Sequence, residues 1–180
     1  MTSTQDSRPG IDHLWDGLVN FRYSLFRLET LQAYSGSSED EAFTEWRSSG
    51  TVPLTRELSQ WCERIRRRVK HGARIQRVHV AIEPPTDYMR FELASYAPNV
   101  EAGEDVRVIP VRDGAWPADV PSSTDYWLID SRQLWEMRYA PDGEWLGAEL
   151  VVDPQRIVDA CAVRDAALAQ SLSWREYQRV

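Results

Sequence analysis

Apolar residues recur every three or four positions between residues 54 and 71, a spacing that predicts one amphipathic helix. The apolar positions of this stretch are Leu58, Trp61, Cys62, Ile65 and Val69. Because these positions share one face of a helix, we expect Trp61 and Ile65 to be buried. Gly72 follows the last turn, as a glycine at a helix C-terminus often does.

Weaker helical spacing predicts four more helices. They cover residues 11–20, a segment with Ala42, Phe43 and Trp46 that ends near Gly50, residues 87–97, and a segment that begins at Asp153-Pro154. An aspartate followed by proline is typical of a helix start, because the missing N–H of proline would have no partner there.

Strand patterns lie between these helices. Residues 75–82 alternate apolar and polar positions, and the other segments are rich in β-branched and aromatic residues. The predicted strands are residues 75–82, 106–111, 126–130, 134–139 and 144–151, with a further extended segment at residues 23–34. The last two strands flank a Pro-Asp-Gly turn and are expected to form a hairpin.

The order of these elements predicts the fold class. Strand 75–82, helix 87–97 and strand 106–111 follow one another within about 37 residues, the length of a βαβ unit with parallel strands. We therefore expect an α/β fold, with α+β as the alternative. It should be a single domain over residues 11–180, with a mixed sheet of about five to six strands, a C-terminal hairpin and flanking helices. Residues 1–10 are polar and are expected to form a disordered tail.

Composition removes some classes of function. The 180 residues carry a net charge of -7, which argues against a nonspecific nucleic-acid or membrane binder. Residues 64–77 nevertheless hold seven lysines and arginines and no acidic residue. This basic stretch is a solvated face, a contact for an acidic partner, or a nucleic-acid contact. With no secretory signal and no apolar run of membrane length in the sequence, we expect a cytoplasmic location.

The sequence lacks the common catalytic and cofactor motifs. There is no P-loop, no glycine-rich dinucleotide pattern, no G-x-S-x-G, no C-x-x-C and no H-E-x-x-H. The three histidines lie far apart in sequence, so we predict no metal site and no cofactor. His79 and Glu83 point to one side of a strand about 13 Å apart, too far for a direct pair. We expect their side of the strand to be a half-exposed sheet face.

Charged and aromatic side chains follow the strand at residues 75–82. Open α/β sheets bind ligands beyond the carboxyl ends of parallel strands, and the helix that follows offers free amides. We expect Glu83, Tyr88 and Arg90 to gather at the mouth of a cleft there, with Asp130 joining them from a third strand. The alternative is a structural turn, in which Glu83 or Asp87 caps the helix and Asp87 pairs with Arg90 on the surface.

Three segments of the chain resemble a known family. They are FRLETLQAY at residues 26–34, RVHVAIEPPTDYMRFEL with NVEAGEDVRVIP in the middle, and DYWLIDSRQLWEMRYAPDGEWLGAELVVDP towards the end. They are similar, in order, to the actinobacterial family domain of unknown function 6879, over about residues 12–177. That family has no assigned chemistry and is often encoded near helix-turn-helix regulators of the XRE type. The resemblance therefore implies a regulatory setting rather than a reaction.

The resemblance also implies which positions carry the family's motifs. They are Arg27, Glu29, Tyr34, Glu83, Pro84, Tyr88, Arg90, Glu92, Gly103, Glu104, Trp127, Asp130 and Gly147. Several are charged or aromatic, more than a core alone would require. Arg27, Glu29 and Tyr34 therefore join the candidate binding residues, which are Glu83, Asp87, Tyr88, Arg90 and Asp130.

A looser resemblance is to one half of a phospholipase D-like domain. The catalytic pattern of that superfamily is His-x-Lys with a downstream Asp, but here His79 is followed by Val80 and Ala81. The missing lysine argues against phosphodiester chemistry. Inactive versions of such domains serve as sensory or dimerisation domains in regulators.

These observations favour a non-enzymatic regulatory or sensory domain. It would bind a protein partner, for example a helix-turn-helix regulator, or a small polar ligand. A homodimer is a further alternative. The first alternative is an enzyme that acts on a polar substrate at the strand carboxyl ends. The second is a nucleic-acid-associated protein that uses residues 64–77.

Overall fold

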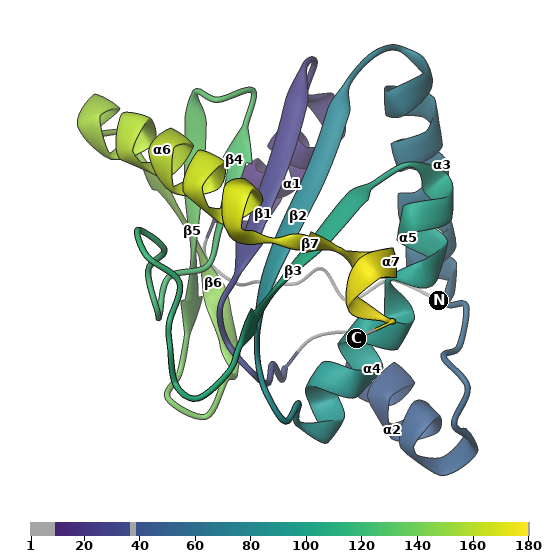
Figure 1. Cartoon of the computed structure of the whole chain (residues 1–180). Coiled ribbons are helices and arrows are strands. Elements are labelled where there is room, and N and C mark those ends of the chain that lie inside the picture. Colours follow the sequence, from purple (N-terminus) through teal and green to yellow (C-terminus); the bar gives the residue numbers. More distant parts are fainter. Residues whose placement is uncertain (1–9, 37–38, 180) are drawn as a thin grey trace.

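The computed structural model of the chain describes residues 10–36 and 39–179. In this part of the chain, seven strands form one sheet in the order β6-β5-β4-β1-β2-β3-β7 (Figure 1). The strands are β1 (Ser24–Glu29), β2 (Arg74–Ile82), β3 (Asp105–Val111), β4 (Tyr126–Ile129), β5 (Gln133–Tyr139), β6 (Trp145–Val151) and β7 (Leu172–Ser173). The predicted tail lies outside the described residues, apart from Gly10.

The helices are α1 (Ile11–Asn20), α2 (Glu39–Ser49), α3 (Arg56–Lys70), α4 (Asp87–Ser95), α5 (Ala97–Ala102), α6 (Pro154–Gln170) and α7 (Trp174–Tyr177). β1, β2 and β3 run parallel, and the other strand pairings within the sheet are antiparallel. α2 and α3 connect β1 to β2, and α4 and α5 connect β2 to β3. The predicted mixed α/β fold is thereby confirmed, with more strands than the sequence suggested.

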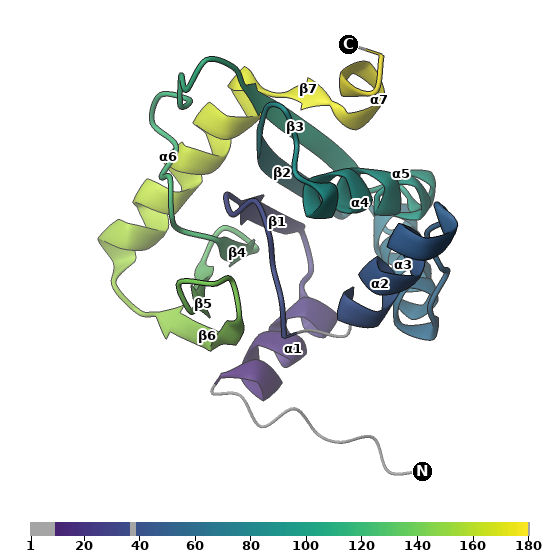
Figure 2. The same ribbon diagram turned by 90° about the horizontal axis from the view of Figure 1, so that it is seen from below.

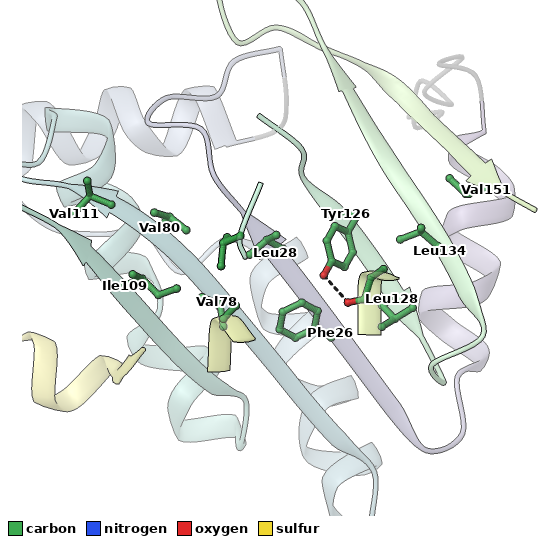
Figure 3. Packing of buried hydrophobic residues seen from close by; sticks show 13 residues of the cluster. Phe26, Leu28, Val78, Val80, Ile109, Val111, Tyr126, Leu128, Leu134 and Val151 are labelled. Carbon is green, nitrogen blue, oxygen red and sulfur yellow. Dashed lines mark hydrogen bonds between the residues drawn. The ribbon is translucent and has the colours of Figure 1, made fainter. Parts of the chain in front are cut away.

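Helices cover both faces of the sheet. α6 lies across one face, and α1 to α5 lie on the side of the other face (Figures 1 and 2). A continuous apolar core fills the space between α6 and the sheet. Its members include Phe26, Leu28, Val78, Val80, Tyr126 and Leu128 (Figure 3). The hydroxyl of Tyr126 donates to the carbonyl oxygen of Ala160 in α6 over 2.9 Å, so even the polar atom of this ring has a partner.

The strongest helix prediction is confirmed, with one difference in burial. α3 lies within residues 54–71, and the hydroxyl of Thr55 caps it by accepting from the backbone N–H of Leu58. Ile65 is fully buried, as predicted. Trp61 is only half-buried, because it lines a hollow described below. The basic side chains of the opposite face are exposed: Arg66, Arg67 and Lys70.

Two features near the ends of predicted elements differ from the expectation. The helix predicted at residues 87–97 ends at Ser95, and a second short helix, α5, then runs through Pro98 to Ala102. Proline is tolerated in the first turn of α5 because its missing N–H needs no partner there. β7 has only two residues, too short for a periodic pattern, and pairs with the edge of β3.

Candidate functional site

Charged and aromatic residues occupy the centre of the sheet face opposite α6. Arg27 of β1 pairs in register with Arg77 of β2 and with Trp127 of β4. Glu29 of β1 pairs in register with His79 of β2. Residues paired in this way point to the same face of a sheet. These five side chains therefore form one layer beneath the helices α1 to α5.

Glu29 joins the two arginines of this layer. Its Oε1 accepts from Nε of Arg27 over 3.2 Å, and its Oε2 accepts from Nη1 of Arg77 over 2.7 Å. Nε of Arg77 also donates to Glu104 over 2.9 Å. Burial alone would raise the pKa of Glu29, but the guanidinium groups of Arg77 and Arg27 hold that pKa well below its usual value. Glu29 is therefore ionised and fixes both arginines.

His79 is fully buried, which favours its neutral form. Its Nε2 lies 3.2 Å from the carbonyl oxygen of Leu31, which only accepts, so Nε2 carries the proton. Its Nδ1 is then an acceptor and lies 2.7 Å from the hydroxyl of Tyr96, whose single proton it shares with Oε2 of Glu29, 3.2 Å from the same hydroxyl. Burial lowers the pKa of His79. The expectation of a half-exposed sheet face is wrong here, because Tyr96, which follows α4, covers the ring.

Asp125, at the start of β4, ties down the segment that follows β1. Its Oδ1 accepts from the backbone N–H and the hydroxyl of Thr30, each over 2.8 Å. Its Oδ2 accepts from the hydroxyl of Tyr34 over 2.6 Å and lies 3.6 Å from Nη2 of Arg27. Tyr34 is thus held against the ring of Tyr139, with 5.3 Å between the ring centroids.

Arg27 keeps a donor that the described residues do not satisfy. Its side chain is only 5% exposed, and its Nη1 is buried with no hydrogen-bond acceptor in residues 10–36 and 39–179. Its Nη2 donates to the hydroxyl of Tyr139 over 3.1 Å. Among the described residues that hydroxyl has no further hydrogen-bond partner, so its proton can be donated to a ligand. An unmatched buried donor costs about 1–3 kcal/mol, and more when charged, so a bound acceptor would be stabilised here.

Arg27 and Tyr139 line one lobe of a two-lobed cavity. The charged lobe has a volume of about 220 Å³ and is lined by Arg27, Glu29, Tyr34 and Tyr139, among others. The aromatic lobe has a volume of about 260 Å³, and its walls include Trp15, Leu58, Trp61 and Phe91. Both lobes are lined by Glu39, Arg77, Glu92 and Trp127, so they adjoin. The aromatic lobe lies between α1 and the layer of α2, α3 and α4, which Figure 2 shows on the same side of the sheet.

Glu92 of α4 lines both lobes and holds a proton at neutral pH. Burial, and after it the charges of Glu39 and Glu29, raises the pKa of Glu92 to about 8. The hydroxyl of Tyr88 lies 3.1 Å from its Oε1. Its protonated carboxyl can donate a hydrogen bond as well as accept one. The boundary between the lobes therefore offers a neutral polar group rather than a further buried charge.

Four of the predicted site residues meet at this cavity. Arg27, Glu29 and Tyr34 line the charged lobe. Tyr88 is buried beside it, with its ring 5.8 Å from that of Tyr34. Glu92, which the family resemblance marked, joins them as a wall of both lobes.

The other predicted residues on the segment after β2 do not join them. Glu83 accepts from Nε of Arg112 over 2.8 Å, and Arg90 pairs with Asp87 over 2.9 Å with both side chains more than half exposed. Glu83 and Arg90 line only a separate surface hollow. The expected cluster of Glu83, Tyr88 and Arg90 is therefore wrong, because the helix turn of α4 sends Tyr88 inward and Arg90 outward.

Asp130 lies at the opposite end of the strands from Glu83. β4 runs antiparallel to β1, so its end lies beside the start of β1 rather than beside the end of β2. Its carboxylate accepts from the backbone N–H groups of Arg22, Tyr23 and Ser24 over 2.7–3.2 Å. The expectation that Asp130 joins Glu83 is wrong for this reason, and its contacts fix the entry to β1.

The sequence-based reasoning missed several residues of the site: Arg77, His79, Tyr96, Asp125 and Tyr139. One signal was available. Arg27 with Glu29, Arg77 with His79, and Asp125 with Trp127 are charged or polar pairs spaced two apart, in or beside three strands with apolar neighbours. Such pairs fall on one face of a sheet, and three of them on adjacent strands make a polar patch.

Two kinds of feature are absent from the described residues. No three His, Cys, Asp or Glu side chains come together there in a way that could hold a metal ion. None of the helices there combines the length and the apolar character that crossing a membrane requires.

The fold and the cavity define a mixed α/β domain that encloses a ligand-sized, two-lobed cavity over an ion-paired floor. Residues 12–179 match the family described as Domain of unknown function (DUF6879), and the chain belongs to this family. No match was found among curated proteins.

Proposed function

We propose that this domain is a non-enzymatic binding module whose cavity holds a small polar ligand. One observation carries the proposal. Arg27 lines the charged lobe, and its buried Nη1 has no hydrogen-bond acceptor in the described part of the chain. Concave sites with apolar walls and a few fixed polar groups are the usual form of ligand sites, which span about 300–1,000 Å³. The two adjoining lobes together suit a ligand at the small end of this range.

The contacts around Arg27 support binding because they hold the side chain in place before a ligand arrives. The guanidinium is held by Glu29 and Tyr139, and it stacks on the ring of Trp127 with 5.2 Å between the charge centre and the ring centroid. A donor fixed in this way loses little side-chain entropy on binding. The charged layer thus serves recognition better than it serves stability.

The surroundings of His79 support a role without phosphodiester chemistry. The ring is fully buried, and both its nitrogens are engaged, by Leu31 and Tyr96. A histidine in this state is not available to attack a substrate. An inactive, sensory relative of phospholipase D-like domains agrees with this arrangement.

We extend the proposal to a regulatory role in the cytoplasm, with a protein partner that reads whether the cavity is occupied. The regulatory setting rests on the family resemblance, which implies that such domains are often encoded near XRE-type regulators. The exposed basic face of α3, with Arg66, Arg67 and Lys70, would suit an acidic surface on such a partner. A pull-down of the regulator encoded nearby with the purified domain tests the protein partner. Replacing all three basic residues with glutamine should reduce the amount of regulator recovered.

Ligand capture tests the binding proposal directly. The purified protein is dialysed against a cell metabolite extract, washed, denatured, and the released small molecules are identified by mass spectrometry. Ala42 is buried and lines the aromatic lobe, so Ala42→Phe should fill the lobe and abolish capture. Ala162→Phe, on an exposed position of α6, is the matched control and should leave capture intact. Equal amounts of every molecule in the wild type and in Ala42→Phe would contradict the proposal.

A second function, general acid–base catalysis, is favoured by one observation. The pKa of Glu92, about 8, is close to the value that suits proton transfer at neutral pH, and Glu92 lines both lobes. The same metabolite extract separates the two functions. Consumption of a metabolite in molar excess over the protein, lost in Glu92→Gln, would favour an enzyme. Stoichiometric capture without consumption favours a binding module.

A further inference from the structure

We infer that the ligand of this cavity is a small uncharged ring compound with a carbonyl oxygen, which lies between Arg27 and Tyr139 while the ring lies in the aromatic lobe. This inference rests on the proposed binding function and deepens it. Three independent features carry it: the unused donors of the charged lobe, the balance of buried charge, and the walls of the aromatic lobe.

The unused donors require an acceptor. Nη1 of Arg27 has no acceptor in residues 10–36 and 39–179, and the hydroxyl of Tyr139, joined to Arg27 by the 3.1 Å hydrogen bond from Nη2, has no further hydrogen-bond partner there. A carbonyl oxygen has two lone pairs and can accept from both. A ligand group that only donates, such as an ammonium, would leave both donors unmatched. The charged lobe therefore selects an oxygen acceptor.

The buried charges disfavour a carboxylate in that position. Two guanidinium groups, of Arg27 and Arg77, already face three carboxylates, of Glu29, Glu104 and Asp125. His79 adds no positive charge, because its ring is neutral. An anionic ligand would bring a further negative charge into a region that already has an excess of it. A neutral acceptor satisfies the same donors without this cost.

The walls of the aromatic lobe fit a flat apolar ring. Trp61 and Trp127 meet edge to face with 6.2 Å between their centroids, and both line the lobe together with Trp15 and Phe91. Aromatic rings pack well in offset or edge-on arrangements of this kind. Because Trp127 also lines the charged lobe, a ring in contact with it is close to Arg27.

Three probes of similar shape test this inference: acetophenone, benzoate and ethylbenzene. They share the ring and differ only in carrying a neutral carbonyl, a carboxylate or no acceptor. Dissociation constants are measured by NMR titration of the tryptophan indole signals of the full chain. We expect acetophenone to bind about tenfold or more tighter than ethylbenzene, since its carbonyl gains a charge-assisted hydrogen bond from Arg27 and a neutral one from the hydroxyl of Tyr139. Benzoate should bind more weakly than acetophenone.

Tyr139→Phe removes one of the two donors while it keeps the ring. We expect this variant to reduce the preference for acetophenone over ethylbenzene by about threefold or more, with ethylbenzene binding unchanged. Tyr23→Phe is the matched control, because Tyr23 is 69% exposed and lines neither lobe. That control should bind all three probes like the wild type.

The possible failures are distinguishable from those of the proposed function. Benzoate as the tightest probe, or equal binding of acetophenone and ethylbenzene, would overturn the uncharged carbonyl ligand and leave the binding function standing. The same conclusion would follow if none of the probes bound while the wild type still captured a metabolite that Ala42→Phe does not. Absence of both probe binding and metabolite capture would overturn both proposals.

Discussion

The two faces of the central strands differ sharply in chemistry although alternate residues of the same strands build them. Towards α6 the strands place Phe26, Leu28, Val78 and Val80, all at most 2% exposed, in one apolar core. Towards α1 to α5, the same strands place charged residues that are nearly as buried. The first face stabilises the sheet through the hydrophobic effect.

The charged face has a different role in the molecule. Desolvation of buried charges often exceeds the gain from pairing them, and apolar replacements of similar volume can be equally stable. The cavity with an unmatched donor lies over this charged face and not over the apolar one. The proposed binding function accounts for this contrast, because a ligand in the cavity would use the charged layer.

Arg77→Met should have the largest effect on stability. It leaves the carboxylates of Glu29 and Glu104 buried without their shared partner. Removing one partner of a buried pair costs about 3–5 kcal/mol. Urea denaturation measures this loss in the free energy of unfolding. Arg66→Met, on the exposed face of α3, is the control and should stay within about 0.5 kcal/mol of the wild type. Similar losses of unfolding free energy in Arg77→Met and Arg66→Met would show that the buried ion pairs are no more important for stability than an exposed arginine.

Leu28→Ala, on the apolar face, should lower the free energy of unfolding by about as much as Arg77→Met or slightly less. The side chain is fully buried in the core beneath α6, so its truncation leaves a cavity at a cost of about 2–5 kcal/mol. The same chemistry applies to Ile65→Ala in α3. Below the unfolding transition, Leu28→Ala should still bind acetophenone like the wild type, because Leu28 points away from the cavity. Lost binding in the folded variant would show that the two faces are coupled.

Glu92→Gln should change how stability depends on pH. The pKa of Glu92 is about 8 in the folded state and about 4.3 in an unfolded chain. The folded state therefore holds more protons, and the stability that this group contributes at low pH is lost as pH rises towards 8. His79, whose pKa is lowered on folding, has the opposite sign and acts below about pH 6.5. Above pH 6.5 the slope therefore reports the carboxyls of the cavity, Glu92 and Glu39, whose pKa burial also raises, and the comparison with Glu92→Gln separates the contribution of Glu92.

Between pH 6.5 and 8 we expect the free energy of unfolding of the wild type to fall more steeply with pH than that of Glu92→Gln. Denaturation curves at half-unit intervals measure both slopes. Parallel slopes would mean that Glu92 is already ionised at pH 6.5. In that case the charged lobe would hold one more negative charge than the structure indicates.

Glu83→Gln and Arg90→Gln should have the smallest effects. Both residues form surface ion pairs, with Arg112 and Asp87 respectively, and such pairs contribute little. We expect melting temperatures within about 2 °C of the wild type and unchanged binding of acetophenone. Weaker acetophenone binding in either variant would indicate that the segment after β2 takes part in binding. It would argue against the cavity as the main site.

Local patterns in the sequence determined most of the secondary structure. Apolar spacing placed α3 to within about two residues, and alternation placed β2, because both signals come from neighbours in the chain. The Pro-Asp-Gly turn placed the hairpin of β5 and β6 for the same reason. The short β7 carried too few residues for any period.

Tertiary structure alone decided which charged residues meet. Arg27, Arg77 and Asp125 are separated by tens of residues in the chain, and only the strand order β4-β1-β2 brings them together. The antiparallel direction of β4 likewise places Asp130 beside the start of β1 and not beside the end of β2. Whether a charged residue of a strand is buried depends on what covers that face. Here the cover is formed by helices from other parts of the chain, which local periodicity does not report.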